Sequence, residues 1–182
     1  MKSVYNFVVT PLNLRYNNTK KIGDKELIVN TEMFNHKYVS REAIVKQIPT
    51  VGDTDIKVGD TVIVHHNVFR RWHNQQGVEK NSRSYIDEEN YLVQPDQIFL
   101  YKNTKWKAQK GYCFVAPIKS TDNLSVDKEK PLVGIVKHTD GTVNKGDLIG
   151  FRPNSEYEFI IDGQKLYRLL SNFITIKYEY QG

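Results

Sequence analysis

Three histidines lie within nine residues of one another, at His65, His66 and His73. Imidazole nitrogens this close in the chain could ligate a transition metal. Two observations argue against such a site. The single cysteine, Cys113, is far away in the sequence, and adjacent side chains on a strand point to opposite faces. We therefore expect no metal at these histidines, and no other motif in the chain indicates a cofactor.

The same segment carries residues that could contact nucleic acid. Arg70 and Arg71 could bind phosphates, while Phe69, Trp72 and Tyr85 could stack on bases. Charge gives this reading little support, because 26 Lys+Arg against 21 Asp+Glu leave a formal net charge of only +5. The alternative is structural: the aromatic side chains pack the segment onto its domain or a neighbouring subunit, and the arginines pair with acidic residues. The sequence favours this packing, with ion pairs to Asp87, Glu88 or Glu89.

The sequence contains no recognisable catalytic motif. There is no glycine-rich phosphate loop and no Ser/His/Asp or Cys/His set in motif-like surroundings, so we do not expect an enzyme. Cys113 is best interpreted as a core residue of a strand. A single cysteine excludes an intrachain disulfide and fits a reducing cytoplasm. The apolar runs are far shorter than the roughly 20 residues needed to cross a bilayer, so we expect no membrane span.

The apolar residues indicate which elements would position these groups. They include 11 Tyr and 8 Phe and occur in short runs separated by Gly, Asp, Asn and Pro, which is typical of an all-β protein. Only residues 32–41 could be helical, and their β-branched and aromatic content argues against it. The predicted strands are 6–10, 26–29, 43–47, 61–65, 91–93 and 97–101, followed by 112–116, 134–138, 148–151, 157–161, 166–169 and 173–178.

The second series of strands repeats the first. Four blocks match in the same order: 8–12 over 114–118, 43–46 over 134–137, 57–64 over 144–151, and 91–102 over 167–178. The pattern therefore predicts two tandem copies of one small domain, at 1–102 and 111–182, joined by the polar linker 103–110. The first copy holds 15 extra residues before its Ile-Val-Lys strand and 11 more after its Gly-Asp strand, the latter within about 66–90.

Several of these blocks resemble one known family. Residues 8–11 (Val-Val-Thr-Pro), 56–64 (Ile-Lys-Val-Gly-Asp-Thr-Val-Ile-Val) and 97–100 (Gln-Ile-Phe-Leu) are similar to the opening, Gly-Asp and closing strands of GroES-type co-chaperonins, or chaperonin-10. In the second copy, residues 145–151 and 161–167 show the same similarity. The resemblance implies two tandem GroES-like small β-barrels. It also implies a cytoplasmic homo-oligomer, with a heptamer as the expected ring and the host cytoplasm as its location if the protein is viral.

The resemblance also implies a binding segment. Members of that family carry a mobile loop after the first strand, which ends in an apolar tripeptide that docks on a GroEL-type chaperonin ring. The matching loop is about 14–32, and the docking tripeptide is Leu27, Ile28 and Val29. The polar run 15–21 cannot bury enough surface to order itself, which suits a mobile loop. The alternative interpretation is that 26–29 is an ordinary strand of the domain.

The chain departs from the family in three respects. Residues 48–55 are too few for the hairpin that roofs the family's cavity, and 119–130 offers no second docking tripeptide. Two domains per chain also cannot fill one sevenfold ring evenly. A duplicated, partly reduced co-chaperonin fits a virus-encoded variant that caps or modulates a host chaperonin. A second class of function is an assembly or nucleic-acid-binding β-barrel module that keeps the fold without the chaperonin role.

Overall fold

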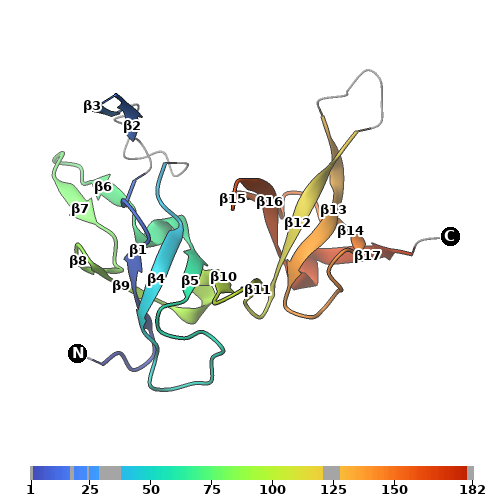
Figure 1. Ribbon diagram of the computed structural model, residues 1–182, viewed down its shortest axis with the longest axis horizontal. Coiled ribbons are helices and arrows are strands. Elements are labelled where there is room, and N and C mark those ends of the chain that lie inside the picture. The colour runs from blue at the N-terminus through green and yellow to red at the C-terminus, as the bar shows by residue number, and fades with distance from the viewer. Residues whose placement is uncertain (1, 17–18, 24, 29–37, 121–127, 180–182) are drawn as a thin grey trace. The chain divides into compact units, whose positions relative to one another are not determined.

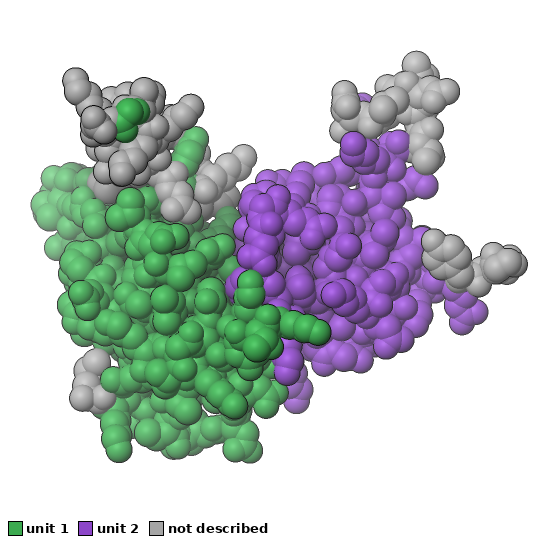
Figure 2. Space-filling view, viewed as in Figure 1, with its two compact units in different colours: residues 1–105 green, residues 106–182 purple. Residues whose placement is uncertain are grey.

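The computed structural model describes residues 2–16, 19–23, 25–28, 38–120 and 128–179 of the chain. It divides the protein into two compact units, residues 1–105 and 106–182, which Figure 2 shows in different colours. The described residues form β-strands joined by turns, with short 3-10 helices, so the all-β prediction is confirmed. No helix in the described part of the chain has the length and apolar character needed to span a membrane.

The main sheet of unit 1 is antiparallel (Figure 1). Its strands β10-β5-β4-β1-β9-β8 are hydrogen-bonded in that spatial order. Two hairpins, β2–β3 and β6–β7, form separate two-stranded sheets. The strand bounds are β1 (Phe7–Pro11), β2 (Thr19–Ile22), β3 (Lys25–Ile28), β4 (Glu42–Gln47), β5 (Thr61–Val64), β6 (Arg71–His73), β7 (Glu79–Asn81), β8 (Tyr85–Asp87), β9 (Asn90–Val93) and β10 (Ile98–Lys102).

Unit 2 contains a second antiparallel sheet with the order β15-β16-β12-β13-β14-β17. The strands within unit 2 are β11 (Trp106–Ala108), which is not part of this sheet, β12 (Tyr112–Lys119), β13 (Glu129–Thr139), β14 (Leu148–Phe151), β15 (Tyr157–Ile161), β16 (Gln164–Leu170) and β17 (Ile174–Tyr178). The 3-10 helices are η1 (His66–Val68), η2 (Pro95–Gln97) and η3 (Ser171–Phe173). Helices η2 and η3 directly precede β10 and β17, which hold corresponding places in the two sheets.

The two sheets share their register as well as their strand order. Pro11 pairs with Ala43 in unit 1, and Pro117 pairs with Gly134 in unit 2. The opening strand is irregular at the same step in both, between Val8 and Val9 and between Phe114 and Val115. The remaining pairs also coincide, as in Val9↔Tyr91 and Val115↔Tyr167, Ala43↔Val62 and Gly134↔Ile149, and Leu100↔Ile63 and Ile176↔Gly150. The structure thus aligns the residues that the four sequence blocks align.

The Gly-Asp turn explains part of this agreement. Gly59 and Gly146 have φ values of 91° and 93°, a conformation that other residues rarely adopt. The Asp60 carboxylate accepts a 2.8 Å hydrogen bond from the backbone N–H of Lys57, and Asp147 accepts one of 2.8 Å from Asn144. Both turns therefore deliver the chain to the start of β5 or β14 in the same geometry.

Each unit has a buried core of its own. In unit 1 the largest fully buried side chains include Tyr91, Phe7 and Phe69. In unit 2 the core cluster contains Cys113, Val115, Val136, Ile149, Phe151 and Leu169. Because strands contribute alternate residues to one face of a sheet, the two cores draw on corresponding positions such as Val9 and Val115.

Two expectations about architecture differ from the structure. The sequence predicted small β-barrels, whereas the antiparallel sheets of the structure are open: β8 is an edge strand in unit 1, and β15 and β17 are the edge strands of the sheet in unit 2. The expected linker 103–110 contains the strand β11, where Trp106 Nε1 donates a 2.7 Å hydrogen bond to Asp162. The possible helix at 32–41 falls mostly outside the described residues, and the described residues 38–41 are not helical.

Candidate functional sites

Strands β2 and β3 lie within the connection between β1 and β4, which we call the β1–β4 loop (residues 12–41). The two strands pair from Thr19↔Ile28 to Ile22↔Lys25, around a turn at Gly23 with φ of 61°. Leu27 and Ile28 end β3, whereas Val29, the third residue of the predicted docking tripeptide, lies outside the described residues. Strand β3 belongs to neither main sheet, unlike the ordinary domain strand of the alternative interpretation.

The base of the β1–β4 loop is fixed on unit 1. Tyr16 and Val39 form an antiparallel bridge, and the Ser40 N–H donates a 3.0 Å hydrogen bond to the Arg15 carbonyl. Arg15 and Tyr16 are each 8% exposed, and Val39 is 3% exposed. The expectation that the polar run 15–21 cannot bury enough surface to order itself is therefore wrong at its first two residues. Their burial depends on partners that are distant in the sequence.

Arg15 connects the loop base to the β5–β9 insertion, residues 65–89. Its Nε donates a 2.9 Å hydrogen bond to the carbonyl of Phe69. Its guanidinium carbon lies 5.3 Å from the ring centroids of both Tyr85 and Tyr91, within the range of cation–π attraction. The Tyr16 hydroxyl adds a second connection by accepting a 2.7 Å hydrogen bond from the Arg71 backbone N–H. The two segments that enlarge the first unit thus contact each other.

The corresponding connection in unit 2 has a different form. Strands β12 and β13 continue to pair up to Lys119↔Glu129. The Ser120 N–H then donates a 2.7 Å hydrogen bond to the Lys128 carbonyl, and 121–127 lie outside the described residues. Fewer residues separate the two strands here than separate β1 from β4. Any apolar docking segment is consequently expected in the first unit.

Packing determines much of the β5–β9 insertion, as the sequence suggested. Phe69 is fully buried with its ring centroid 4.8 Å from that of Tyr91, and Tyr85 packs partly buried against the same core. Arg71 forms ion pairs with Glu79 at 3.4 Å and Glu88 at 4.0 Å. Phe69 is therefore inaccessible to a base, and Arg71 is already paired with carboxylates.

The histidines pack against each other and do not gather into a metal site. Strand β5 ends at Val64, so the rule of opposite faces does not apply beyond it. The rings of His65 and His66 stack with centroids 4.3 Å apart, and His65 Nδ1 accepts a 3.1 Å hydrogen bond from the Asn67 N–H. Across the described residues, no group of three or more His, Cys, Asp or Glu side chains could hold a metal ion.

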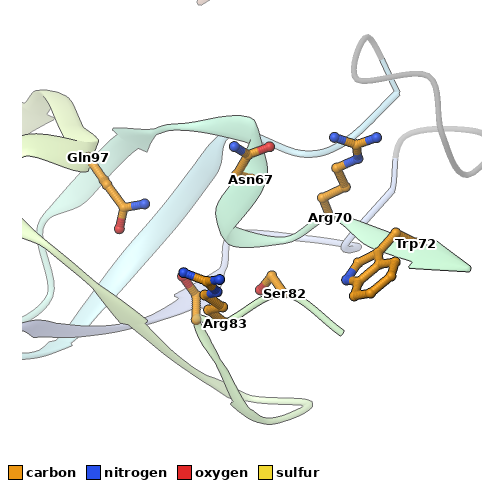
Figure 3. Close-up of a pocket in the computed structure, with 7 residues that line it drawn as sticks. Asn67, Arg70, Trp72, Ser82, Arg83 and Gln97 are labelled. Carbon is orange, nitrogen blue, oxygen red and sulfur yellow. The ribbon is translucent and has the colours of Figure 1, made fainter. Parts of the chain in front are cut away.

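A pocket of about 540 Å³ opens beside this segment (Figure 3). Figure 3 shows Asn67 on η1 after β5, Arg70 just before β6, Trp72 on β6, and Ser82 and Arg83 in the connection between β7 and β8. Sequence reasoning placed Arg70 and Trp72 in a candidate site but missed the other residues of the pocket. Those residues are Asn67, Ser82, Arg83, Ser84 and Gln97.

Cys113 has the environment of a core residue. Its side chain is fully buried, and burial together with the Asp140 charge raises the pKa of the thiol to about 12. The reactive thiolate form is thereby suppressed at neutral pH.

Comparison with known proteins identifies no family for this chain, because no family model and no curated protein matches it.

Proposed function

We propose that the chain is a co-chaperonin-like protein made of two GroES-like β domains. In this proposal it binds a GroEL-type chaperonin ring through Leu27, Ile28 and Val29 and caps or modulates the folding chamber. The observation that carries the proposal is the β2–β3 hairpin, which forms a sheet of its own and interrupts unit 1, whereas the described residues of unit 2 contain no such separate hairpin between β12 and β13. The resemblance of the Gly-Asp and opening strands to co-chaperonins supports the same conclusion.

The separate position of the β2–β3 hairpin explains how it could bind a partner. An extended apolar segment can add to a groove on a partner, with backbone hydrogen bonds giving affinity and alternate side chains giving specificity. Ordering the segment costs conformational entropy, but the bridge between Tyr16 and Val39 already fixes both ends of its base. Several such segments on one oligomer would multiply the weak individual contacts.

The outer strands of the sheets support a homo-oligomer. Tyr157 and Ile160 on β15 are 59% and 58% exposed, and Ile176 on β17 is 51% exposed. Exposed apolar side chains on outer strands favour pairing with another chain. We propose that neighbouring chains join at these edges and so place several β2–β3 hairpins on one ring.

The test is a pull-down of purified chaperonin by the oligomeric protein. Changing Leu27, Ile28 and Val29 together to serine removes the apolar side chains that would enter the groove. We expect wild-type protein to retain the chaperonin and the triple variant to lose at least about tenfold in affinity, because burying each aliphatic side chain contributes on the order of 1.5 kcal/mol or more.

A matched control removes three exposed apolar side chains elsewhere in unit 1: Val51, Val58 and Val78, which are 54%, 61% and 50% exposed. Changing these valines together to serine should leave chaperonin binding intact. Full binding by the Leu27, Ile28 and Val29 variant would refute the docking assignment. Equal loss in both variants would instead indicate non-specific apolar adsorption.

A further inference from the structure

The pocket beside the β5–β9 insertion shares no lining residue with the proposed docking tripeptide, Leu27, Ile28 and Val29. Its lining contains two arginines, Arg70 and Arg83, and no acidic side chain. Arg70 is half-buried, and its Nε has no hydrogen-bond partner in the described structure. Within the same described residues, Arg83 is exposed and makes no ion pair, in contrast to the neighbouring Arg71. Within the described residues neither Arg70 nor Arg83 forms an ion pair, so the pocket holds two positive charges without a carboxylate partner.

An indole lies beside these charges. Trp72 is 44% exposed, although large aromatic side chains usually bury most of their surface. It pairs directly across the β6–β7 hairpin with Lys80, so the two side chains share one face of that small sheet. Arg71 and His73, the neighbours of Trp72 on β6, belong to the opposite face by the same alternation. The pocket side of the hairpin thus combines an aromatic surface with positive charge.

The remaining lining residues supply neutral hydrogen-bonding groups. Asn67 and Gln97 contribute side-chain amides, and Ser84 contributes a hydroxyl. Ser82 is fixed by its 2.6 Å hydrogen bond to the Val68 carbonyl. A volume of about 540 Å³ lies within the range of small-ligand pockets. The site can therefore accommodate a planar polar group together with an attached anion.

We propose that this pocket binds a nucleotide unit of a single-stranded nucleic acid. Arg70 and Arg83 contact the phosphate, and the base stacks on Trp72. An acidic peptide would use the arginines but would give the exposed indole no planar partner. This proposal is independent of chaperonin docking, because none of its residues lies in the β1–β4 loop.

The experiment measures binding of a fluorescently labelled oligothymidylate of about 15 nucleotides, long enough for a single-strand site, by anisotropy at several salt concentrations. Changing both arginines to glutamine should weaken binding and reduce the slope of log K against log salt by about 0.7 for each lost phosphate contact. Trp72→Ala should weaken binding about 5- to 100-fold, while Trp72→Phe keeps a stacking surface and most of the affinity.

The matched control changes Lys107 and Lys110, two exposed lysines of unit 2, to glutamine and removes the same amount of charge. It should bind like wild type. If Arg70→Gln perturbs folding, the single Arg83→Gln variant provides the same test, because Arg83 is exposed. Equal weakening by the arginine and lysine variants would overturn the proposal in favour of diffuse charge.

Competition identifies the source of the anion. A single-strand site should be displaced by unlabelled oligothymidylate far more readily than by thymidine monophosphate, inorganic phosphate or polyglutamate. Displacement by polyglutamate at equal charge, with Trp72→Ala unchanged, would overturn the proposal and indicate an acidic-peptide site. Absence of binding by the wild-type protein at low salt would also overturn it.

Discussion

Arg15 carries a charge in the interior of unit 1, where it joins segments far apart in the sequence. Its Nε–H satisfies the carbonyl of the fully buried Phe69, and its guanidinium lies near two tyrosine rings. Glu88 Oε2 lies 3.9 Å from Arg15 Nη1 but is largely exposed, so it compensates the buried charge only partly. This arginine therefore stabilises the unit mainly through its hydrogen bond and its packing.

Replacing Arg15 with alanine should lower the free energy of unfolding by about 2 to 3 kcal/mol. The Phe69 carbonyl would lose its hydrogen-bond partner inside the protein, and the two tyrosines would lose packing. Urea denaturation measures this loss. Arg83→Ala, which removes an exposed guanidinium, should change stability by less than about 0.5 kcal/mol. A similarly small effect at Arg15 would show that its buried contacts contribute little.

At the scale of elements, the sequence predicted the main strands because local signals agree with one another. Alternating apolar residues define the strand faces, and the Gly-Asp turn fixes where β5 and β14 begin. The blocks 91–102 and 167–178 align without a gap because η2 and η3 occupy the same place in each. The existence of the main strands in each copy could therefore be predicted from the sequence, whereas the short strands β2, β6, β7, β8 and β11 were not.

Other elements depended on contacts that no local pattern reveals. The burial of Arg15 requires the Phe69 carbonyl, 54 residues away. Strand β11 lies in a polar segment and includes Trp106, whose Nε1 bonds to Asp162, 56 residues away. In the candidate pocket, Arg83 and Gln97 come from separate connections and meet Arg70 only through the fold. The periodicity of apolar residues in the sequence cannot predict contacts between residues so far apart.

Asp140 shows how one side chain can hold several turns of unit 2 together. Its carboxylate accepts hydrogen bonds from the Gly111 N–H at 2.8 Å, the Ser171 hydroxyl at 2.9 Å and the Thr142 hydroxyl at 2.7 Å. Burial raises the pKa of Asp140, but these hydrogen bonds outweigh burial and lower the pKa below its usual value of 3.8. The folded structure of unit 2 therefore stabilises the ionised form of the Asp140 carboxyl group.

Acid should therefore destabilise unit 2 through this group. With a lowered folded-state pKa, the stabilisation is complete above the unfolded value of 3.8 and is lost as pH falls through the folded-state pKa. We expect Asp140→Asn to cost about 1 kcal/mol at neutral pH and to flatten the decline of stability below about pH 5. Urea midpoints measured against pH test this. The control Asp53→Asn, at an exposed position, should follow the wild-type curve of stability against pH. If Asp140→Asn also followed the wild-type curve, the hydrogen bonds of Asp140 would contribute nothing to stability.

For the whole molecule, the proposed function requires several chains to act together. One docking tripeptide offers little surface, and multiple copies on one assembly raise the effective concentration of each. The exposed apolar side chains of β15 and β17 provide edges through which such an assembly could close.

Native mass spectrometry should detect a ring of seven chains of 21.2 kDa, about 148 kDa in total. Changing Tyr157, Ile160 and Ile176 together to serine should shift the population to smaller species, because it removes apolar area from the edges. A strictly monomeric wild-type protein at micromolar concentration would contradict the ring, and assembly unaffected by the edge variant would place the interface elsewhere.

The register shift that β1 and β12 share in their pairing with β4 and β13 also bears on how the two units are related. A bulge is a specific backbone feature, and it falls at the same step in both units. The recurrence of this register shift within the same strand order agrees with the sequence repeat in indicating two copies of one domain. The β2–β3 hairpin and the arginine-lined pocket both belong to unit 1, so within the described residues the proposed binding features lie on the copy with the two longer connections.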